Sequence, residues 1–577
     1  TDRAISYRAD KGFSKMDVAL SVGVQQMVRS DVGMSGVMFS LDTESGFQDV
    51  VIISAAYGLG ENVVQGTVTP DLYSVYKKTL GVAKNPILEK TLGSKAKAMI
   101  YSKNPANPIV NTNVPQKKRD QFALTEKEIL ILAKYAVAIE NHYKRPMDME
   151  WAKDGRNGKL FIVQARPETV HGGRKKLELV QYRLQKRGSV LTFGRSVGEK
   201  IGAGKARVIH DVKGIHSFKA GEILVTKMTD PDWEPIMKIA GGIVTDQGGR
   251  TSHAAIVARE MNIPAIVGTK TASKKIKTGR QVTVSCAEGE TGYVYSGAQP
   301  FTVTRSKLNK IPRTKIKVML ILGEPETAFT HSFLPVDGVG LARLEFIINN
   351  SVKVHPLALM NFAKLKDPKL KAKIQKITSH YTNKKEFYID ELASGIGRIA
   401  AGFFPRDIIV RFSDFKSNEY ANLIGGTLYE PVEENPMLGW RGASRYYHPS
   451  FIEAFKLECR AIRKVRETMG LTNVKVMLPF CRTVDEVKKV LAIMKQVGLV
   501  SGKDGLMVYM MVEIPSNVLL MDKFAKHVDG FSIGSNDLTQ LTLGMDRDSA
   551  IIAKIGDERN EAVMGFIAQA VRQARAL

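Results

Sequence analysis

The sequence predicts a multidomain α/β protein, and three observations indicate this fold class. The 577 residues correspond to about three to five domains, at roughly 100–200 residues per domain. Two basic segments with the character of linkers, 171–176 and 302–317, separate three regions of different texture. From residue 317 onward, apolar runs alternate with helical stretches, which is typical of a parallel sheet covered by helices. A content of 44% hydrophobic and 25% charged residues fits a chain with sizeable buried cores.

The first region, residues 1–172, mixes helical and strand-like patterns. Helices are expected at 17–30 and 126–142, and the strand-like runs include 36–40, 50–55 and 160–163. Further along this region, Asp148 and Glu150 alternate in one run, and Gln164 and Arg166 alternate in the next. On their own, these four residues could simply form the solvated sides of two strands.

The second region, residues 190–300, has short strand-like runs around Gly-rich turns and one helix that starts near Ser252. Two glycines, Arg250, Thr251 and Ser252 come directly before His253, which opens an apolar helical stretch. The free N–H groups at a helix start attract anions, and its positive end favours a neutral, nucleophilic histidine. Arg250 and Thr251 could then stabilise a phosphoryl group on His253. The alternative is a first-turn histidine that only satisfies a backbone group.

The third region, residues 317–577, contains six apolar runs, at 318–322, 338–341, 407–410, 475–480, 506–514 and 530–534. Polar residues stand at or near the ends of several of these runs: Arg343, Arg411, Glu513, Asn536 and Asp537. A (β/α)₈ barrel places such residues around its active-site mouth, at the C-terminal ends of its strands. Any one of them alone could be an ordinary surface residue.

Several classes of protein are excluded by composition. The only three cysteines, Cys286, Cys459 and Cys481, are widely spaced, which excludes a disulfide scaffold and a Cys-rich zinc site. Each is expected to be a buried or free thiol. The longest apolar runs, such as 506–512, are far shorter than the roughly 20 residues that span a bilayer. With no signal-peptide pattern at the start, we expect a cytoplasmic protein without a membrane partner.

The net charge of +26, from 84 Lys and Arg against 58 Asp and Glu, is the unusual compositional feature. Basic clusters occur at 117–119, 174–176, 274–277 and 364–376, and they lack the interleaved aromatic residues of a single-strand binding groove. Solvated surfaces therefore explain them better than a nucleic-acid partner, which we do not expect.

The string from Thr245 to Gly268 resembles the phosphohistidine domain of the PEP-utilising enzymes. The resemblance implies that His253 is the residue that carries the phosphoryl group. Arg250 before Thr-Ser-His, and Ile-Pro-Ala-Ile-Val-Gly after it, are more similar to the phosphoenolpyruvate synthases of this family than to its pyruvate phosphate dikinases.

The first region is similar to the ATP-grasp-type nucleotide domain of the same family, through the strings at 1–8, 36–46 and 57–66. In that domain a pair of strands carrying Asp-x-Glu and Gln-x-Arg holds Mg–ATP, which here implies Asp148, Glu150, Gln164 and Arg166. Glu150 and Gln164 would be the metal ligands, since Mg²⁺ prefers oxygen donors, and Arg166 would contact phosphate.

The third region is similar to the family's barrel, which binds phosphoenolpyruvate and pyruvate. The resemblance implies that Glu513 and Asp537 hold Mg²⁺ and that Arg343 and Arg411 neutralise the phosphoryl group. Arg441 could be a further anion contact or a buried structural residue. The remaining residues that the resemblance places around the substrate are Asp414, Gly534, Ser535 and Asn536.

Taken together, the resemblance implies part of an ATP-grasp-type nucleotide domain, a swivelling phosphohistidine β/β/α domain and an incomplete (β/α)₈ TIM-type barrel. The family's Gly-x-Cys-Gly turn on the last barrel strand and the N-terminal lobe of its nucleotide domain are both missing, so we expect a chain truncated at both ends. A barrel without its final βα unit would expose two sheet edges. Linkers at about 172–190 and 300–317 would let the phosphohistidine domain move.

The implied activity is synthesis of phosphoenolpyruvate from pyruvate, ATP and water, with AMP and phosphate released and with Mg²⁺ as cofactor. Two alternatives remain: a catalytically incomplete remnant that only binds phosphoenolpyruvate or takes part in phosphotransfer, and a pyruvate phosphate dikinase. ATP and pyruvate or phosphoenolpyruvate are the expected small-molecule partners, and a homodimer is possible.

Overall fold

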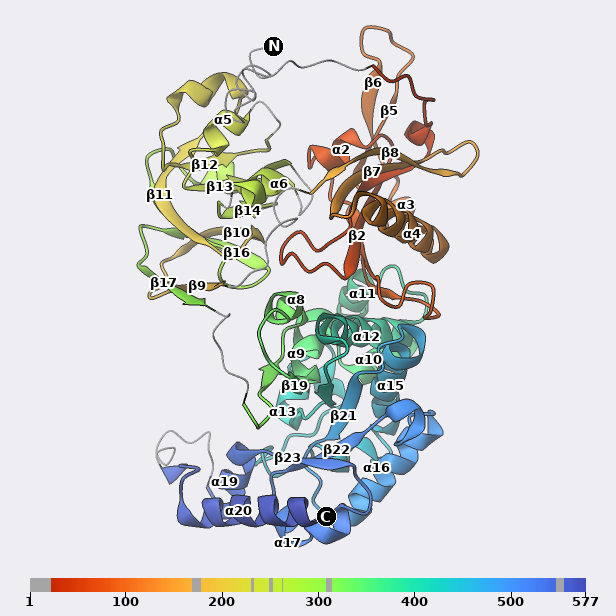
Figure 1. Cartoon of the computed structure of the whole chain (residues 1–577), viewed down its shortest axis with the longest axis vertical. Helices are drawn as coiled ribbons and strands as arrows, with labels where there is room; N and C mark the ends of the chain where they lie inside the picture. Colours follow the sequence, from red (N-terminus) through yellow and green to blue (C-terminus); the bar gives the residue numbers. More distant parts are fainter. Residues whose placement is uncertain are drawn as a thin grey trace.

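The computed structural model describes residues 22–168, 178–229, 233–248, 253–261, 263–307, 314–545 and 555–577. They form three regions that we call the first (22–168), second (178–307) and third (314–577) regions. Figure 1 shows the first and second regions side by side above the third, with the C-terminus in the lower part of the third region. The predicted multidomain α/β class is confirmed.

The first region is built on a six-stranded sheet of order β4-β3-β2-β1-β7-β8, in which all neighbours are antiparallel. The helix α4 (Glu126–Tyr143) packs on one face, where its Leu132 and Ala133 meet Met149 and Trp151 of the sheet. A capping box between Thr125 and Glu128 fixes where α4 begins. The bounds of the strands are β1 (Met34–Phe39), β2 (Val50–Tyr57), β3 (Asp71–Tyr76), β4 (Ile87–Thr91), β7 (Met147–Lys153) and β8 (Leu160–Pro167), and β5 (Lys97–Tyr101) pairs with β6 (Ile109–Asn113) separately.

In the second region, the described strands close into a barrel of order β10-β14-β13-β12-β11-β15-β16. Parallel pairs join β11 to β12, β12 to β13 and β13 to β14, and the remaining pairs are antiparallel. The helix α6 (His253–Glu260) buries Ala254, Ala255, Val257 and Ala258 against this barrel. The strand bounds are β10 (Val190–Val197), β11 (Ile201–Val208), β12 (Ile223–Thr226), β13 (Gly242–Thr245), β14 (Ala265–Val267), β15 (Gln281–Ser285) and β16 (Thr291–Ser296), with short helices α5 (Glu234–Met237) and α7 (Ala272–Lys275).

The third region contains a six-stranded, fully parallel sheet in which the strands follow their order in the sequence, β18-β19-β20-β21-β22-β23. All six apolar runs that the sequence indicated are therefore strands, joined by helices as expected for βα units. The sheet is open, because β18 and β23 each have one neighbour. The strands are β18 (Met319–Leu322), β19 (Gly338–Arg343), β20 (Ile408–Arg411), β21 (Val474–Leu478), β22 (Val508–Val512) and β23 (Gly530–Ile533), and the long helices are α11 (Pro368–Ile377), α12 (Lys384–Phe403), α15 (Ile452–Arg463), α16 (Val484–Gln496), α19 (Ser535–Leu543) and α20 (Glu561–Ala576).

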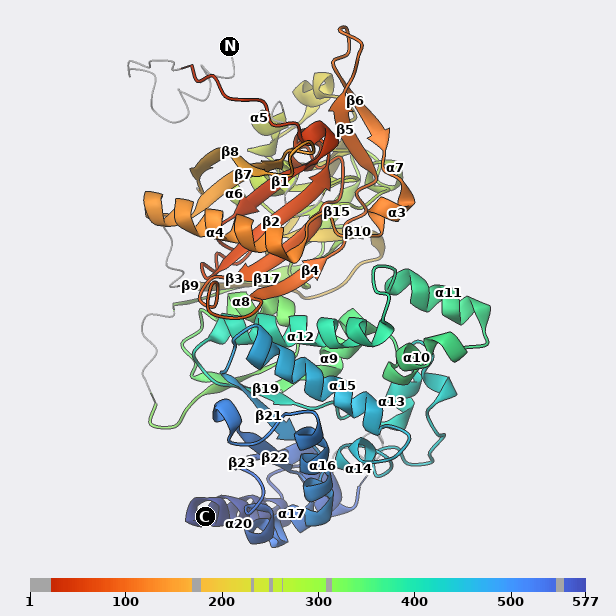
Figure 2. The same ribbon diagram turned by 90° about the vertical axis from the view of Figure 1, so that its right-hand side faces the viewer.

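The first and third regions share one hydrophobic core, whereas the second touches them through polar contacts. The rings of Phe47 and Phe329 stack with centroids 4.5 Å apart, and Tyr76 and Leu88 are buried in the same cluster as α12. Figure 2 shows α12 directly beneath the antiparallel sheet. The second region meets its neighbours through bonds such as those from the Gly198 N–H to Glu44 and from the Thr330 hydroxyl to Glu199, both 3.3 Å long.

Two expectations from the sequence need correction. A helix was expected at 17–30, but residues 22–29 have no regular structure, and residues 17–21 lie outside the described part of the chain. Val22 and Val24 are almost fully exposed, so the apolar side of that pattern has no surface to pack on, and short helices depend on such packing. The expected linkers also contain strands, since β9 (Glu178–Leu184) and β17 (Phe301–Lys307) pair as a two-stranded antiparallel ribbon.

The three cysteines are free and buried, as expected. Burial raises the pKa of the Cys286 thiol to about 12, and it also raises the pKa values of Cys459 and Cys481. None of the helices within the described residues has the length and apolar character needed to cross a bilayer.

Candidate active site

The predicted nucleotide residues lie on two paired strands of the first region. Asp148 of β7 stands opposite Arg166 of β8, and Glu150 stands opposite Gln164. The intervening Met149 points into the core beneath α4, so the four polar residues share the opposite face of the sheet. The structure therefore brings the four predicted side chains together as two cross-strand pairs.

Charge and burial distinguish these four residues. The Arg166 guanidinium donates to Asp148 over 2.8 Å, and Gln164 is exposed. Burial raises the pKa of Asp148 and of Glu150, the charge of Asp148 raises the pKa of Glu150 further, and Arg166 opposes both effects. A buried and a half-buried carboxylate beside an arginine suit a cation bound to a phosphate chain.

His253 is the first residue of α6, as the sequence indicated. In Figure 1, α6 lies on the side of the second region that is turned toward the first region. Gly248, shortly before the helix, has a φ of 113°, a backbone conformation that favours glycine. The predicted residues Arg250 and Thr251 and the side chain of His253 lie outside the described part of the structure.

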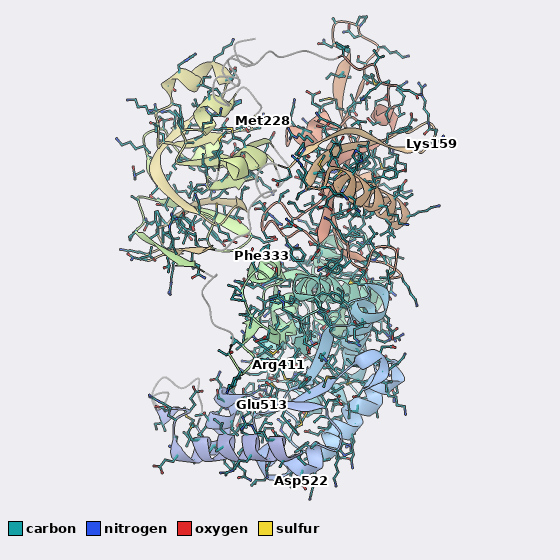
Figure 3. All side chains as sticks on the ribbon, viewed as in Figure 1. Lys159, Met228, Phe333, Arg411, Glu513 and Asp522 are labelled. Carbon is teal, nitrogen blue, oxygen red and sulfur yellow. The ribbon has the colours of Figure 1, made fainter. Side chains whose placement is uncertain are left out.

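The substrate residues predicted in the third region gather at the C-terminal ends of its parallel strands. Arg343 and Arg411 are the last residues of β19 and β20, and Glu513 directly follows β22. After β23, Gly534 caps α19, so that Ser535, Asn536 and Asp537 occupy the first turn of this helix. Figure 3 labels Arg411 and Glu513, which lie close together at this edge of the sheet.

Arg441 ties two of these strand ends together. Its guanidinium donates to Asp414 over 3.1 and 2.5 Å and to Asp537 over 2.8 Å, and it stacks on the Phe480 ring at 4.1 Å. The residue is 2% exposed. Burial works against its charge, but Asp414 and Asp537 outweigh burial and raise the pKa of Arg441. Of the two roles weighed for Arg441, the structure displays the buried link between site residues.

Glu513 lies at the centre of a crowded set of carboxylates. It is 1% exposed, and its Oε1 accepts a 2.6 Å hydrogen bond from the Phe480 N–H. Burial raises the pKa of Glu513 to about 8, with further increases from Asp414 and Asp537 and opposing effects from Arg411 and Arg441. A buried carboxylate of this kind is stabilised by a cation, so the residues present fit a divalent metal between Glu513 and Asp537.

The close approach of Gly534 to Glu513 explains why this position is a glycine. A Cβ at Gly534 would lie 2.8 Å from Oε2 of Glu513 and 2.8 Å from Cε of Met511. Asn517 fixes the same strand end, because its side-chain oxygen accepts from the N–H groups of Glu513 and Ile514. The site residues of β22 and α19 are therefore held by direct packing.

Sequence reasoning missed two further carboxylates at this edge of the sheet, Glu345 and Glu458. Glu345 accepts from Arg411 over 2.8 Å and from the Asp414 N–H over 2.7 Å. Glu458, on α15, is fully buried and accepts from the hydroxyl and the N–H of Ser413. Glu345 stands two residues after Arg343, which was a possible signal, but nothing in the sequence marks Glu458.

The three regions also match family models. Residues 1–186 match the model described as "Pyruvate phosphate dikinase, AMP/ATP-binding domain". Residues 218–289 match "PEP-utilising enzyme, mobile domain", and residues 301–577 match "PEP-utilising enzyme, PEP-binding domain". The matches follow the same order as the three structural regions.

Curated proteins match along the whole chain. It is 56% identical to "Phosphoenolpyruvate synthase" of Synechocystis sp., over 100% of this chain and 71% of that protein. It is 53% identical to the proteins of the same name from Aquifex aeolicus and Escherichia coli, over 100% of this chain and 74% and 72% of those proteins, respectively. The chain therefore belongs to the PEP-utilising enzyme family, as a relative of its phosphoenolpyruvate synthases.

Proposed function

We propose that this chain is a phosphotransferase that makes phosphoenolpyruvate from pyruvate, ATP and water, with release of AMP and phosphate. The observation that carries the proposal is the convergence of Arg343, Arg411, Glu513 and Asp537 at one edge of the parallel sheet. Two guanidinium groups and two carboxylates are what phosphoryl transfer to a keto acid requires.

The three regions divide the reaction among them. Asp148, Glu150, Gln164 and Arg166 bind Mg–ATP, with Glu150 and Gln164 as the metal ligands. His253 accepts a phosphoryl group from ATP, aided by Arg250 and Thr251, and later passes it to the enolate oxygen of pyruvate. A neutral histidine is needed for the first step, and the start of α6 favours that form.

In the third region, Arg343 and Arg411 neutralise the incoming phosphoryl group. Glu513 and Asp537 hold Mg²⁺, which when bound polarises the keto acid and stabilises the enolate charge. Asp414 keeps Arg441 in place, and Gly534, Ser535 and Asn536 line the pyruvate. The raised pKa of Glu513 supports a cation there, since the buried charge is otherwise poorly compensated.

The finer architecture belongs to the same proposal. The antiparallel pair of β7 and β8, with one polar face, supports an ATP-grasp-type first region. Six parallel strands in sequence order support a TIM-type barrel for the third region. The second region contacts its neighbours through polar bonds such as Gly198 N–H to Glu44 and Thr330 to Glu199, which supports a swivelling domain.

Transfer of label from [³²P]phosphoenolpyruvate to the chain tests the phosphohistidine. With Mg²⁺ present, the unmodified chain should acquire an acid-labile label, and His253→Ala should acquire none. The exposed His216, in the same region, provides the control His216→Ala, which should be labelled normally. Normal labelling of His253→Ala would refute the assignment.

The alternatives considered from the sequence can be separated by their products. A synthase passes the second phosphoryl group to water and releases orthophosphate, whereas a dikinase of the other type passes it to orthophosphate and releases pyrophosphate. In a reaction with ATP, pyruvate and added orthophosphate, ³¹P NMR therefore distinguishes the two by whether pyrophosphate appears. A remnant would bind phosphoenolpyruvate without forming it. The names of the relatives favour the synthase. A homodimer and the lack of a nucleic-acid partner stay predictions.

A further inference from the structure

Glu345 occupies an unusual place at the edge of the parallel sheet. It stands in the first turn of α9 (Leu344–Ile347), directly after β19, and its side chain is 13% exposed. One oxygen, Oε1, accepts both a 2.8 Å bond from the Arg411 guanidinium and a 2.7 Å bond from the Asp414 N–H. Glu345 therefore joins the end of β19 to the turn that follows β20.

That turn, residues 411–414, carries two of the proposed substrate residues. Its far side is held by Glu458, which accepts a 2.5 Å bond from the Ser413 hydroxyl and a 3.1 Å bond from the Ser413 N–H. The turn is thus held between two carboxylates from different elements. Of these two carboxylates, Glu345 is the one that bonds the Arg411 guanidinium, whose Nη1 atom also lies 3.8 Å from Asp414 Oδ2, so the orientation of this guanidinium depends on Glu345 rather than on Glu458.

One nitrogen of the Arg411 guanidinium is left without a hydrogen-bond acceptor. Glu345 engages the Nη2 atom of Arg411, whereas the Nε atom is buried without a hydrogen-bond partner. The Nε atom of Arg343 and the Oε2 atom of Glu345 are likewise buried and unpartnered. Buried N–H groups without acceptors are costly, so these two guanidinium edges favour an anion that would satisfy them.

We propose that Glu345 is a positioning residue for phosphoryl transfer, which holds Arg411 with its Nε edge turned toward the phosphoryl group. The proposal rests on the proposed function, because it takes the phosphoryl-bearing substrate as the ligand of Arg411. Glu345 acts through Arg411 and need not contact the substrate. A charged acceptor is required, since hydrogen bonds between ionised partners are about twice as strong as neutral ones.

Calorimetric binding of two probes to the whole chain in MgCl₂ tests this role. Phosphoenolpyruvate carries a phosphoryl group, and oxalate chelates Mg²⁺ but has no phosphoryl group. Glu345→Gln keeps the size of the side chain and removes its charge, so its affinity for phosphoenolpyruvate should fall about 10- to 100-fold, whereas its affinity for oxalate should change less than about threefold. The control Glu453→Gln, at an exposed residue of α15 that pairs with Lys456, should bind both probes normally.

A double-mutant cycle separates positioning from a general structural effect. If Glu345 acts through Arg411, then Glu345→Gln should add little to the loss of phosphoenolpyruvate affinity that Arg411→Ala causes on its own. Additive losses, equal losses for both probes, or unchanged phosphoenolpyruvate binding by Glu345→Gln would each overturn the proposal. If the unmodified chain bound neither probe, the proposed function itself would fail and the role of Glu345 with it.

Discussion

Replacing Arg441 by methionine would remove the guanidinium that joins Asp414 to Asp537 while keeping much of the side-chain volume. Its three hydrogen bonds to the carboxylates, of 2.5, 3.1 and 2.8 Å, would be lost together with a 3.3 Å bond to the Met437 carbonyl oxygen, and the carboxylates would remain in an environment where Arg441 itself is 2% exposed. Removing one partner of a buried ion pair costs about 3–5 kcal/mol, because the remaining charge is left uncompensated. Because the third region shares its core with the first, the two should melt together, and for about 400 residues the cost corresponds to a fall of about 3–6 °C in their common melting temperature.

Differential scanning calorimetry with and without Mg²⁺ measures this effect. Because Glu513 lies beside the same carboxylates, a divalent cation should replace part of the lost positive charge. Mg²⁺ should therefore raise the melting temperature of Arg441→Met by more than it raises that of the unmodified chain. The matched control is Arg482→Met, since Arg482 also stacks on Phe480, at 4.7 Å, but donates to the carbonyl oxygens of Leu438 and Gly439.

Two results would refute the reasoning. If Arg441→Met melted within about 2 °C of the unmodified chain, the carboxylates would not depend on the buried guanidinium. If Mg²⁺ stabilised both proteins equally, the charge left by Arg441 would not be at the proposed metal position. Arg482→Met should lose no more than about 1–2 kcal/mol, because neutral acceptors are left behind.

The remaining predictions concern a buried acid and a glycine of the same edge. Burial raises the pKa of Glu458 to about 7, so the native state binds its proton more tightly than the unfolded chain does. The stability that this proton contributes is fully present below about pH 4.5 and is lost as the pH rises to about 7. Between pH 5 and pH 8, the free energy of unfolding of Glu458→Gln, measured by urea denaturation, should therefore fall by roughly 2–3 kcal/mol less than that of the unmodified chain. Equal falls for the two proteins would contradict the assignment. Gly534→Ala would place a methyl group 2.8 Å from the Glu513 carboxylate, so phosphoenolpyruvate formation should fall at least about tenfold in a coupled assay. The control Gly565→Ala, in α20 with open space around it, should keep full activity, and an active Gly534→Ala would show that the carboxylate can shift freely.

The sequence predicted the strands and the site residues best where the residue pattern and the chemistry of the side chains indicate the same structure. The apolar runs of the third region became parallel strands because each run is short and flanked by helical stretches; the central strands β21 and β22 are largely buried, whereas the edge strands β18 and β23 are more exposed. The alternation of Asp148 with Glu150 and of Gln164 with Arg166 anticipated one polar face, since side chains alternate along a strand. The start of α6 at His253 followed from the glycines and hydroxyl residues before it.

Long-range pairing was the part that could not be predicted. The barrel of the second region closes through strands such as β14, only three residues long, whose partners are distant in the sequence. The role of Glu345 depends on a contact 66 residues away with Arg411, and that of Glu458 on a contact 45 residues away with Ser413. The helix expected at 17–30 failed within residues 22–29 because periodicity alone does not supply a packing surface.

The ribbon of β9 and β17 has a mechanical consequence for the second region. The chain enters and leaves this region on two strands paired from Glu178 with Lys307 to Leu184 with Phe301, so both ends depart at the same place. Two separate linkers would restrain a domain at two points, whereas the paired strands of one ribbon hold it at a single point. If the second region moves as the proposed function requires, it would turn about this ribbon, and the range of its motion would be set by the paired strands rather than by two separate linkers.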